Sequence, residues 1–183
     1  MSLHEIPSER DCFGLLEKYQ TPPHIVLHSK KVWDVAKVLA EGLRVKRIPL
    51  DMPLVRASCL LHDIGKYPCI LDGTGFHDVR GEQILQEEGF PAVARIVVQH
   101  VILTADPGEG LKEEHVLFYS DKRVVHDQLV SLDERFVYLQ ETYGKTSGAV
   151  KRLLAMKNET IRLEQQIFLH LDFKPAEVVG LLS

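Results

Sequence analysis

Apolar residues recur every three or four positions along almost the whole chain, and this spacing restricts the fold more than any other feature. It predicts helices over residues 10–20, 24–42, 50–64, 79–88, 91–103 and 149–171, one or two helices within 112–143, and a last short helix from Pro175. The glycine-rich segment 65–76 and the segment 104–110 are predicted to be loops. No segment alternates apolar and polar residues for long enough to indicate a sheet. We therefore expect an all-α protein.

The composition is that of an ordinary globular domain. The chain has 183 residues, 45% of them hydrophobic and 26% charged, so we expect residues 1–183 to form one domain. Its net charge of −4 argues against a nucleic-acid surface or binding to an anionic membrane, and no apolar run is long enough to span a membrane. The three cysteines are widely spaced, and the first residues do not resemble a signal peptide. Both features favour a cytoplasmic location.

Histidine and aspartate side chains stand at the apolar edges of successive helices. The dipeptide His-Asp occurs three times, which alone is weak evidence, but His62-Asp63 closes a strongly apolar helix, where a polar pair is costly to bury unless it binds something. His77 begins the next helix after the loop, and His100 lies within an apolar stretch. His28 and Asp121 are also in apolar surroundings.

Each of these residues has an ordinary explanation when taken alone. A single histidine on an apolar face is more often a hydrogen-bonded core residue, and a single aspartate is more often a helix cap or an ion-pair partner. Together, however, a helical bundle can project them to one point. Imidazole and carboxylate ligands suit Fe, Mn, Zn, Co or Ni, and the lack of thiolate ligands disfavours a structural zinc site.

The order of these residues resembles that of the HD-domain metal-dependent phosphohydrolases, in their two-metal, HDIG-like branch. The local sequence Leu60-Leu61-His62-Asp63-Ile64-Gly65-Lys66 supports the resemblance, as does Gly81 four residues after His77. The resemblance covers residues 24 to about 125. It implies an HD-domain helical bundle with a core of about 24–130. The resemblance does not cover residues 131–183, which we expect to form a helical extension that serves packing, dimerisation or substrate choice.

The resemblance also implies a ligand set for two divalent metal ions, with Fe, Mn, Co, Ni and Zn all open. One ion would be held by His28, His62, Asp63 and Asp121, and the second by His77 and His100, with Asp63 bridging. A hydroxide that bridges the two metals would then attack phosphorus. Asp63 and Lys66 are the predicted catalytic residues, and Lys66 and Arg80 are the predicted substrate contacts.

The function implied is hydrolysis of a nucleotide or a dinucleoside polyphosphate, as in bacterial enzymes that split diadenosine tetraphosphate symmetrically. A di-iron oxygenase with the same six ligands and a non-catalytic, metal-bound nucleotide sensor remain as alternatives. We expect a small-molecule nucleotide partner, no nucleic acid and no membrane, and a homodimer through residues 149–171 is possible. Lys122 and Arg123 are predicted to lie at the surface or to support the ligands. The histidines predicted to have no role in the site are His4, His24, His115, His126 and His170.

Overall fold

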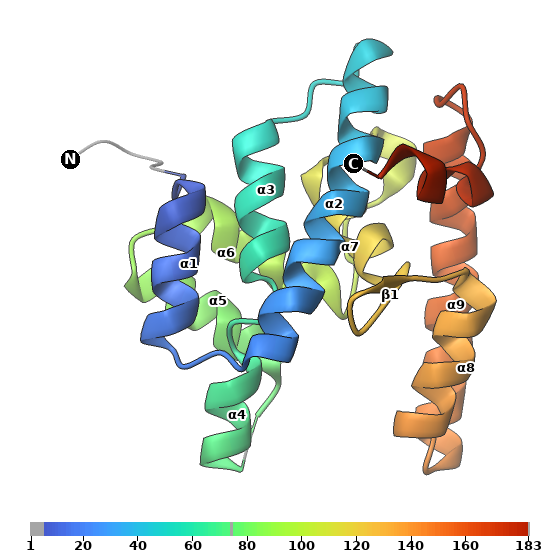
Figure 1. Ribbon diagram of the computed structural model, residues 1–183. Coiled ribbons are helices and arrows are strands. Elements are labelled where there is room, and N and C mark those ends of the chain that lie inside the picture. The colour runs from blue at the N-terminus through green and yellow to red at the C-terminus, as the bar shows by residue number, and fades with distance from the viewer. Residues whose placement is uncertain (1–5, 74, 183) are drawn as a thin grey trace.

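The computed structural model describes residues 6–73 and 75–182, and in this part of the chain the prediction of an all-α fold is confirmed (Figure 1). The α-helices are α1 (Glu9–Lys18), α2 (Pro23–Val45), α3 (Met52–Leu61), α4 (Lys66–Asp72), α5 (His77–Glu87), α6 (Pro91–Val97), α7 (Glu113–Asp121), α8 (Leu132–Tyr143) and α9 (Ser147–Phe168). The 3-10 helices are η1 (Val98–His100), η2 (Pro107–Glu109) and η3 (Pro175–Leu181). Within the described residues the only strands are β1 (Val124–Val125) and β2 (Gln128–Leu129), which pair antiparallel.

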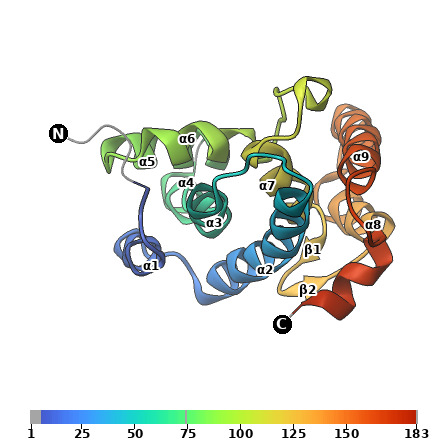
Figure 2. The ribbon, with the colours of Figure 1, turned by 90° about the horizontal axis from the view of Figure 1, so that it is seen from above.

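Helices α2, α3 and α7 form the centre of the molecule. They pack on one another, while α1, α5 and α6 lie to one side of them and α8 and α9 to the other (Figures 1 and 2). One core cluster joins α2 to α7 through residues such as Leu39 and Phe118, and a second joins α3 to α5 through residues such as Leu60 and Ile84. The polar residues at the ends of α3 and α7 are therefore surrounded by apolar packing.

The structure corrects three details of the predicted elements. The segment 104–110, predicted to be a loop, contains the 3-10 helix η2 (Pro107–Glu109). Residues 66–72 form helix α4 instead of continuing a loop, and none of their side chains is buried, so the sequence carried no amphipathic signal there. Gly73, at a φ of +65°, ends this helix in a left-handed conformation that glycine adopts without strain. Residues 124–129 form a hairpin, and its strands of two residues each are too short to show an alternating pattern.

The C-terminal helices are attached to the core by a buried arginine. Arg123 is buried, whereas the sequence placed it at the surface or beside the ligands. Its Nη1 donates to the hydroxyl of Tyr119 at 2.6 Å, and its other nitrogens donate to the carbonyls of Val130 and Pro175. The Tyr119 hydroxyl in turn donates to Glu164 of α9. These bonds hold α9 and η3 against α7. Helix α8 packs against α9 and is therefore held in place with it.

Residues 131–183 do not pack as a separate body in the part described. Leu163, Ile167 and Val178 belong to the same core cluster as α2 and α7. The division into a core of about 24–130 and an extension stays a prediction. None of the helices in the described ranges has both the length and the apolar character that crossing a membrane requires.

Candidate metal centre

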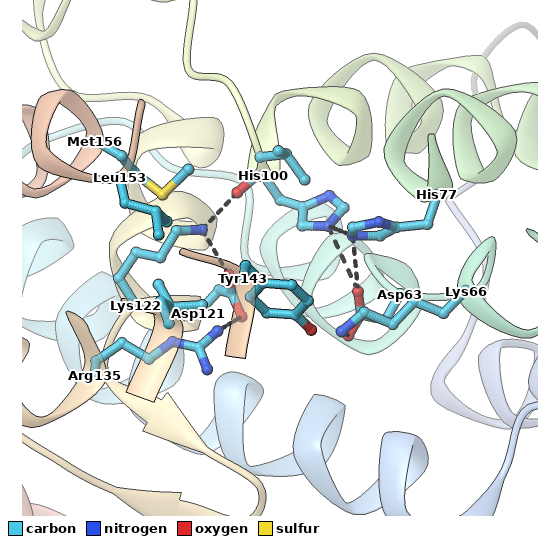
Figure 3. Close-up of a pocket in the computed structure, with 12 residues that line it drawn as sticks. Asp63, Lys66, His77, His100, Asp121, Lys122, Arg135, Tyr143, Leu153 and Met156 are labelled. Carbon is cyan, nitrogen blue, oxygen red and sulfur yellow. Dashed lines mark hydrogen bonds and ion pairs between the residues drawn. The ribbon is translucent and has the colours of Figure 1, made fainter. Parts of the chain in front are cut away.

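The six predicted metal ligands come together at one point, from five different elements. They form two groups, and within each group the ligand atoms all lie within 4.8 Å of one another. The groups are His28, His62 and Asp121, and Asp63, His77 and His100. Figure 3 shows His77, His100 and Asp63 pointing toward one another, with Asp121 nearby.

The corner after α3 brings the ligands of α3 and α5 into contact. A side chain at Gly65 would place its Cβ 2.1 Å from the carbonyl oxygen of His77 and 2.6 Å from the amide nitrogen of Gly81. Only glycine permits this approach of two backbones. The first turn of α5 therefore packs directly against the residues that follow Asp63, and this packing places His77 beside that carboxylate.

In three of the four histidines, a backbone carbonyl binds the same ring nitrogen, Nδ1, and so fixes which nitrogen faces the centre. The Nδ1 atoms contact carbonyl oxygens in the pairs His28 with His126 (2.8 Å), His62 with Cys59 (2.8 Å) and His100 with Val97 (2.7 Å). Because a carbonyl oxygen only accepts, each Nδ1 carries the hydrogen, and in the neutral ring the lone pair is on Nε2. Metal-ligating histidines are characteristically oriented in this way.

The Nε2 atom of His62 shows that the donor set fits a cation. It is buried and has no hydrogen-bond partner among the described residues, although it lies 3.4 Å from Asp63 Oδ2 and 3.7 Å from Asp121 Oδ1. Burial alone would lower the pKa of His62, but the two carboxylates outweigh this effect and raise it. The position thus attracts positive charge, which a proton or a metal ion can supply.

Asp63 faces both groups of ligands with different oxygen atoms. Its Oδ1 lies 3.6 Å from His77 Nε2 and 3.5 Å from His100 Nε2, whereas its Oδ2 faces His62 and accepts a hydrogen bond from Lys66 Nζ at 2.6 Å. This geometry is compatible with a bridging carboxylate. The assignment of the remaining ligands to one metal or the other stays a prediction.

Two cavities open on the centre, and Arg135 lines both of them. The first, of about 240 Å³, lies on the side of His77 and has an apolar wall. That wall consists of Val101, Leu139, Leu153 and Met156, with Tyr143. The second, of about 290 Å³, lies on the side of His28 and includes His24 and Tyr138. Both cavities include Asp63 and Lys66.

Of the two predicted substrate contacts, the structure places Lys66 at the metal centre and Arg80 away from it. Lys66 lies at the centre, with its side chain one-third exposed. Arg80 is half-buried on α5 and lines neither cavity; its charge instead acts on Tyr19 and Cys69, whose pKa values it lowers against the larger raising effects at those residues. Its position does not support a substrate contact.

The fold brings further residues to the centre, and of these the sequence predicted only Lys122, as a residue either at the surface or in support of the ligands. Lys122 is buried, and its Nζ donates to Asp121 Oδ2 at 2.6 Å and to the carbonyl of His100 at 2.7 Å. Arg135 was not predicted at all, and its Nη2 lies 3.4 Å from Asp121 Oδ1. His126, predicted to have no role, provides the carbonyl that orients His28. Two signals were usable: Lys122 directly follows a predicted ligand, and Arg135 stands at helical spacing from the apolar Leu132 and Leu139.

A family model of the HD domain matches residues 25–123, more than half of the chain, so the protein belongs to the HD domain family. All six predicted ligands lie inside the matched segment, whereas α8 and α9 lie outside it.

Three curated proteins are similar to the chain. It is 34% identical to a tRNA (cytidine(56)-2'-O)-methyltransferase of Thermoplasma volcanium over 113 residues, which cover 61% of this chain and 29% of that protein. It is 30% identical to a tRNA (cytidine(56)-2'-O)-methyltransferase of Picrophilus torridus over 148 residues, 76% of this chain and 41% of that protein. It is 27% identical to an uncharacterized protein of Methanocaldococcus jannaschii over 150 residues, 74% of this chain and 87% of that protein. The chain therefore spans less than half of either methyltransferase, and no solved structure matches it.

Proposed function

We propose that this protein is a metal-dependent phosphohydrolase that acts on a nucleotide or a dinucleoside polyphosphate. The observation that carries the proposal is the unpaired, buried Nε2 of His62, which faces two carboxylates within a cluster of six imidazole and carboxylate groups. Such a cluster at the base of two open cavities suits divalent cations that meet an incoming anion.

The six ligands would hold two divalent metal ions. Bound there, such ions supply positive charge at the phosphoryl oxygens and lower the pKa of an attacking water. Lys66 contributes a further positive charge at the same place: its Nζ lies on Asp63 and lines both cavities. From there it can donate to a non-bridging oxygen as negative charge develops on the phosphoryl group.

The apolar wall of the first cavity supports a nucleoside as the organic part of the substrate. Leu139, Leu153 and Met156 offer flat apolar contact beside the metal ligands, and Tyr143, 58% exposed, stands at the edge. A cavity of about 240 Å³ is smaller than the roughly 300–1,000 Å³ of sites for drug-sized ligands. It suits one nucleoside, and the second cavity would take the other nucleoside of a dinucleoside substrate.

The proposed substrate is a small molecule. The net charge of −4 and the limited size of both cavities favour a free nucleotide over an RNA chain. The methyl transfer in the names of two relatives is a property of proteins of which this chain spans only 29% and 41%. The homodimer and the cytoplasmic location stay predictions.

The test is a substrate panel on protein stripped of metal and reloaded with Mn, Co, Ni, Fe or Zn. Nucleoside mono-, di- and triphosphates, dinucleoside polyphosphates and a transfer RNA are incubated with each form, and the products are separated. We expect metal-dependent release of a nucleotide or of phosphate that Asp63→Ala abolishes. Asp172→Ala removes an exposed carboxylate far from the ligands and is the matched control.

Two other results would each replace the proposal. Oxygen consumption by the iron-loaded protein, without hydrolysis of any substrate, would identify an oxygenase. Nucleotide binding without either reaction would identify a sensor.

A further inference from the structure

Three cationic side chains surround the two carboxylates of the metal centre. Lys66 Nζ lies 2.6 Å from Asp63, while Lys122 Nζ and Arg135 Nη2 lie 2.6 Å and 3.4 Å from Asp121. With the four histidines counted as neutral, three cations face two carboxylates at the centre before any divalent metal is added. Each cation is paired, but an excess of positive charge at the centre favours the binding of an anionic ligand.

Three neighbouring buried cations differ in how well their donors are satisfied. Lys122 Nζ has two short bonds, to Asp121 and to the carbonyl of His100. Arg123 uses Nε, Nη1 and Nη2, each with its own acceptor. In Arg135, which is 9% exposed, Nη2 makes one long contact, and Nε is buried with no acceptor among the described residues.

The unsatisfied donor of Arg135 indicates that an acceptor is missing beside it. A buried donor without an acceptor costs about 1–3 kcal/mol, and more when the group is charged. Arg123 avoids this cost. Arg56 Nε is likewise buried with no acceptor among the described residues, but Arg56 lines neither cavity, so Arg135 is distinguished by its place at the metal centre. Arg135 also lines both cavities, so an acceptor that enters either cavity can reach its guanidinium.

The position of Arg135 on α8 separates it from the ligand set. Arg135, Leu139 and Tyr143 follow one another at four-residue spacing, so they share one face of α8, and both cavities include all three. This helix follows the segment that the HD family model matches. Residues 25–123, which the family model matches, supply the proposed metal ligands. Helix α8 supplies a wall of both cavities, which a substrate bound at the metals would also contact.

We propose that Arg135 is a specificity residue that binds a phosphoryl group next to the one being hydrolysed. The substrate class is then nucleotides with at least two linked phosphoryl groups, in preference to nucleoside monophosphates. The planar guanidinium can donate two parallel hydrogen bonds to phosphate oxygens, which an ammonium group cannot do. This inference rests on the proposed function and specifies its substrate.

The first test measures binding without metal or turnover. Calorimetric titrations of chelator-treated protein use inorganic pyrophosphate and inorganic phosphate as probes. We expect Arg135→Gln to weaken pyrophosphate binding about tenfold and phosphate binding less than about twofold. Arg152→Gln removes the same charge from an exposed position on α9 and should change neither.

The second test measures the ratio of kcat/KM for a nucleoside diphosphate to that for the corresponding monophosphate. This ratio does not depend on how much of a variant is folded. We expect Arg135→Gln to lower the ratio about tenfold and Arg135→Lys, which keeps the charge and loses the planar donor pair, to lower it less.

The outcomes separate this inference from the proposed function. Equal losses for both substrates, or for both calorimetric probes, would overturn it and leave Arg135 as a support for Asp121. If the wild-type protein hydrolyses no phosphate ester or anhydride, the proposed function fails, and the calorimetric comparison still decides whether Arg135 binds a second phosphoryl group.

Discussion

The Nε2 atoms of His77 and His100 lie 3.0 Å apart, although the two rings come from separate elements, α5 and η1. Burial lowers the pKa of both rings, that of His77 to about 4, so both are neutral at neutral pH. His100 donates its Nδ1 hydrogen to the carbonyl of Val97, which leaves its Nε2 as an acceptor. A hydrogen on His77 Nε2 can bridge to His100 Nε2, and a cation between the two nitrogens can take the place of this hydrogen.

The first prediction concerns the number of metal ions. His77→Ala and His100→Ala should each reduce the metal content from two ions per chain to one, because each removes a ligand from the same group. Elemental analysis of the purified, reloaded protein measures the content. His170→Ala removes an exposed histidine and should retain two ions. Two ions per chain in both His77→Ala and His100→Ala would contradict the two-metal assignment.

The second prediction uses the two glycines at the corner between α3 and α5. Gly65→Ala should destabilise the fold by about 1–3 kcal/mol or more, because its Cβ would collide with the backbone at His77. It should also lower the metal content, since α5 must move away from Asp63. Chemical denaturation and elemental analysis measure the two effects.

Gly81→Ala is the matched control for the corner. A Cβ at Gly81 meets Val97 and Ile64 at ordinary contact distances of 3.4 and 3.6 Å. The variant should therefore fold and bind metal nearly as the wild type does. If Gly65→Ala behaves in the same way, the close approach does not position His77.

The ligands were predictable because their signal is local. His62 and Asp63 end an apolar helix, and a polar pair in that position is conspicuous in the sequence. Arg135 gives a weaker signal: it stands on the apolar face of α8, at helical spacing from the buried Leu132 and Leu139, but an arginine there can also extend its charged end to solvent. Helix α4 escaped prediction for a related reason, since it buries no side chain. Sequence periodicity reports which face of a helix is buried, and it does not report that the face carrying Arg135 packs over the metal ligands.

The third prediction concerns stability as a function of pH. Glu88 accepts hydrogen bonds from Lys18 and Tyr19 of the α1 region, and these bonds lower the pKa of Glu88 below its usual value of 4.5. A carboxyl whose pKa is lowered by folding stabilises the protein above its unfolded pKa and loses this contribution as pH falls through the lowered pKa. Glu88→Gln should therefore destabilise the protein by about 0.5–1 kcal/mol at pH 7, a modest value because the pair is partly exposed.

The difference between wild type and Glu88→Gln should shrink as pH falls below about 4.5. Urea denaturation at a series of pH values measures it. Glu87→Gln changes the adjacent exposed carboxylate, which makes no hydrogen bond to the other described residues, and serves as the control. A difference that is constant from pH 7 to pH 3 would show that the carboxylate's charge is not what stabilises the contact.

The last prediction tests whether the apolar wall receives the nucleoside. Met156 is half-buried and lines the first cavity, so Met156→Trp should fill much of its 240 Å³. We expect KM for a nucleotide substrate to rise about tenfold, while the metal content and the hydrolysis of inorganic pyrophosphate, which has no base, stay close to wild type. Leu154→Trp places the same side chain at a neighbouring position of α9 that is 53% exposed, and it should leave KM unchanged. Equal kinetics for Met156→Trp and the wild type would place the base outside this cavity, and the second cavity, beside His24 and Tyr138, would then be the remaining position for it.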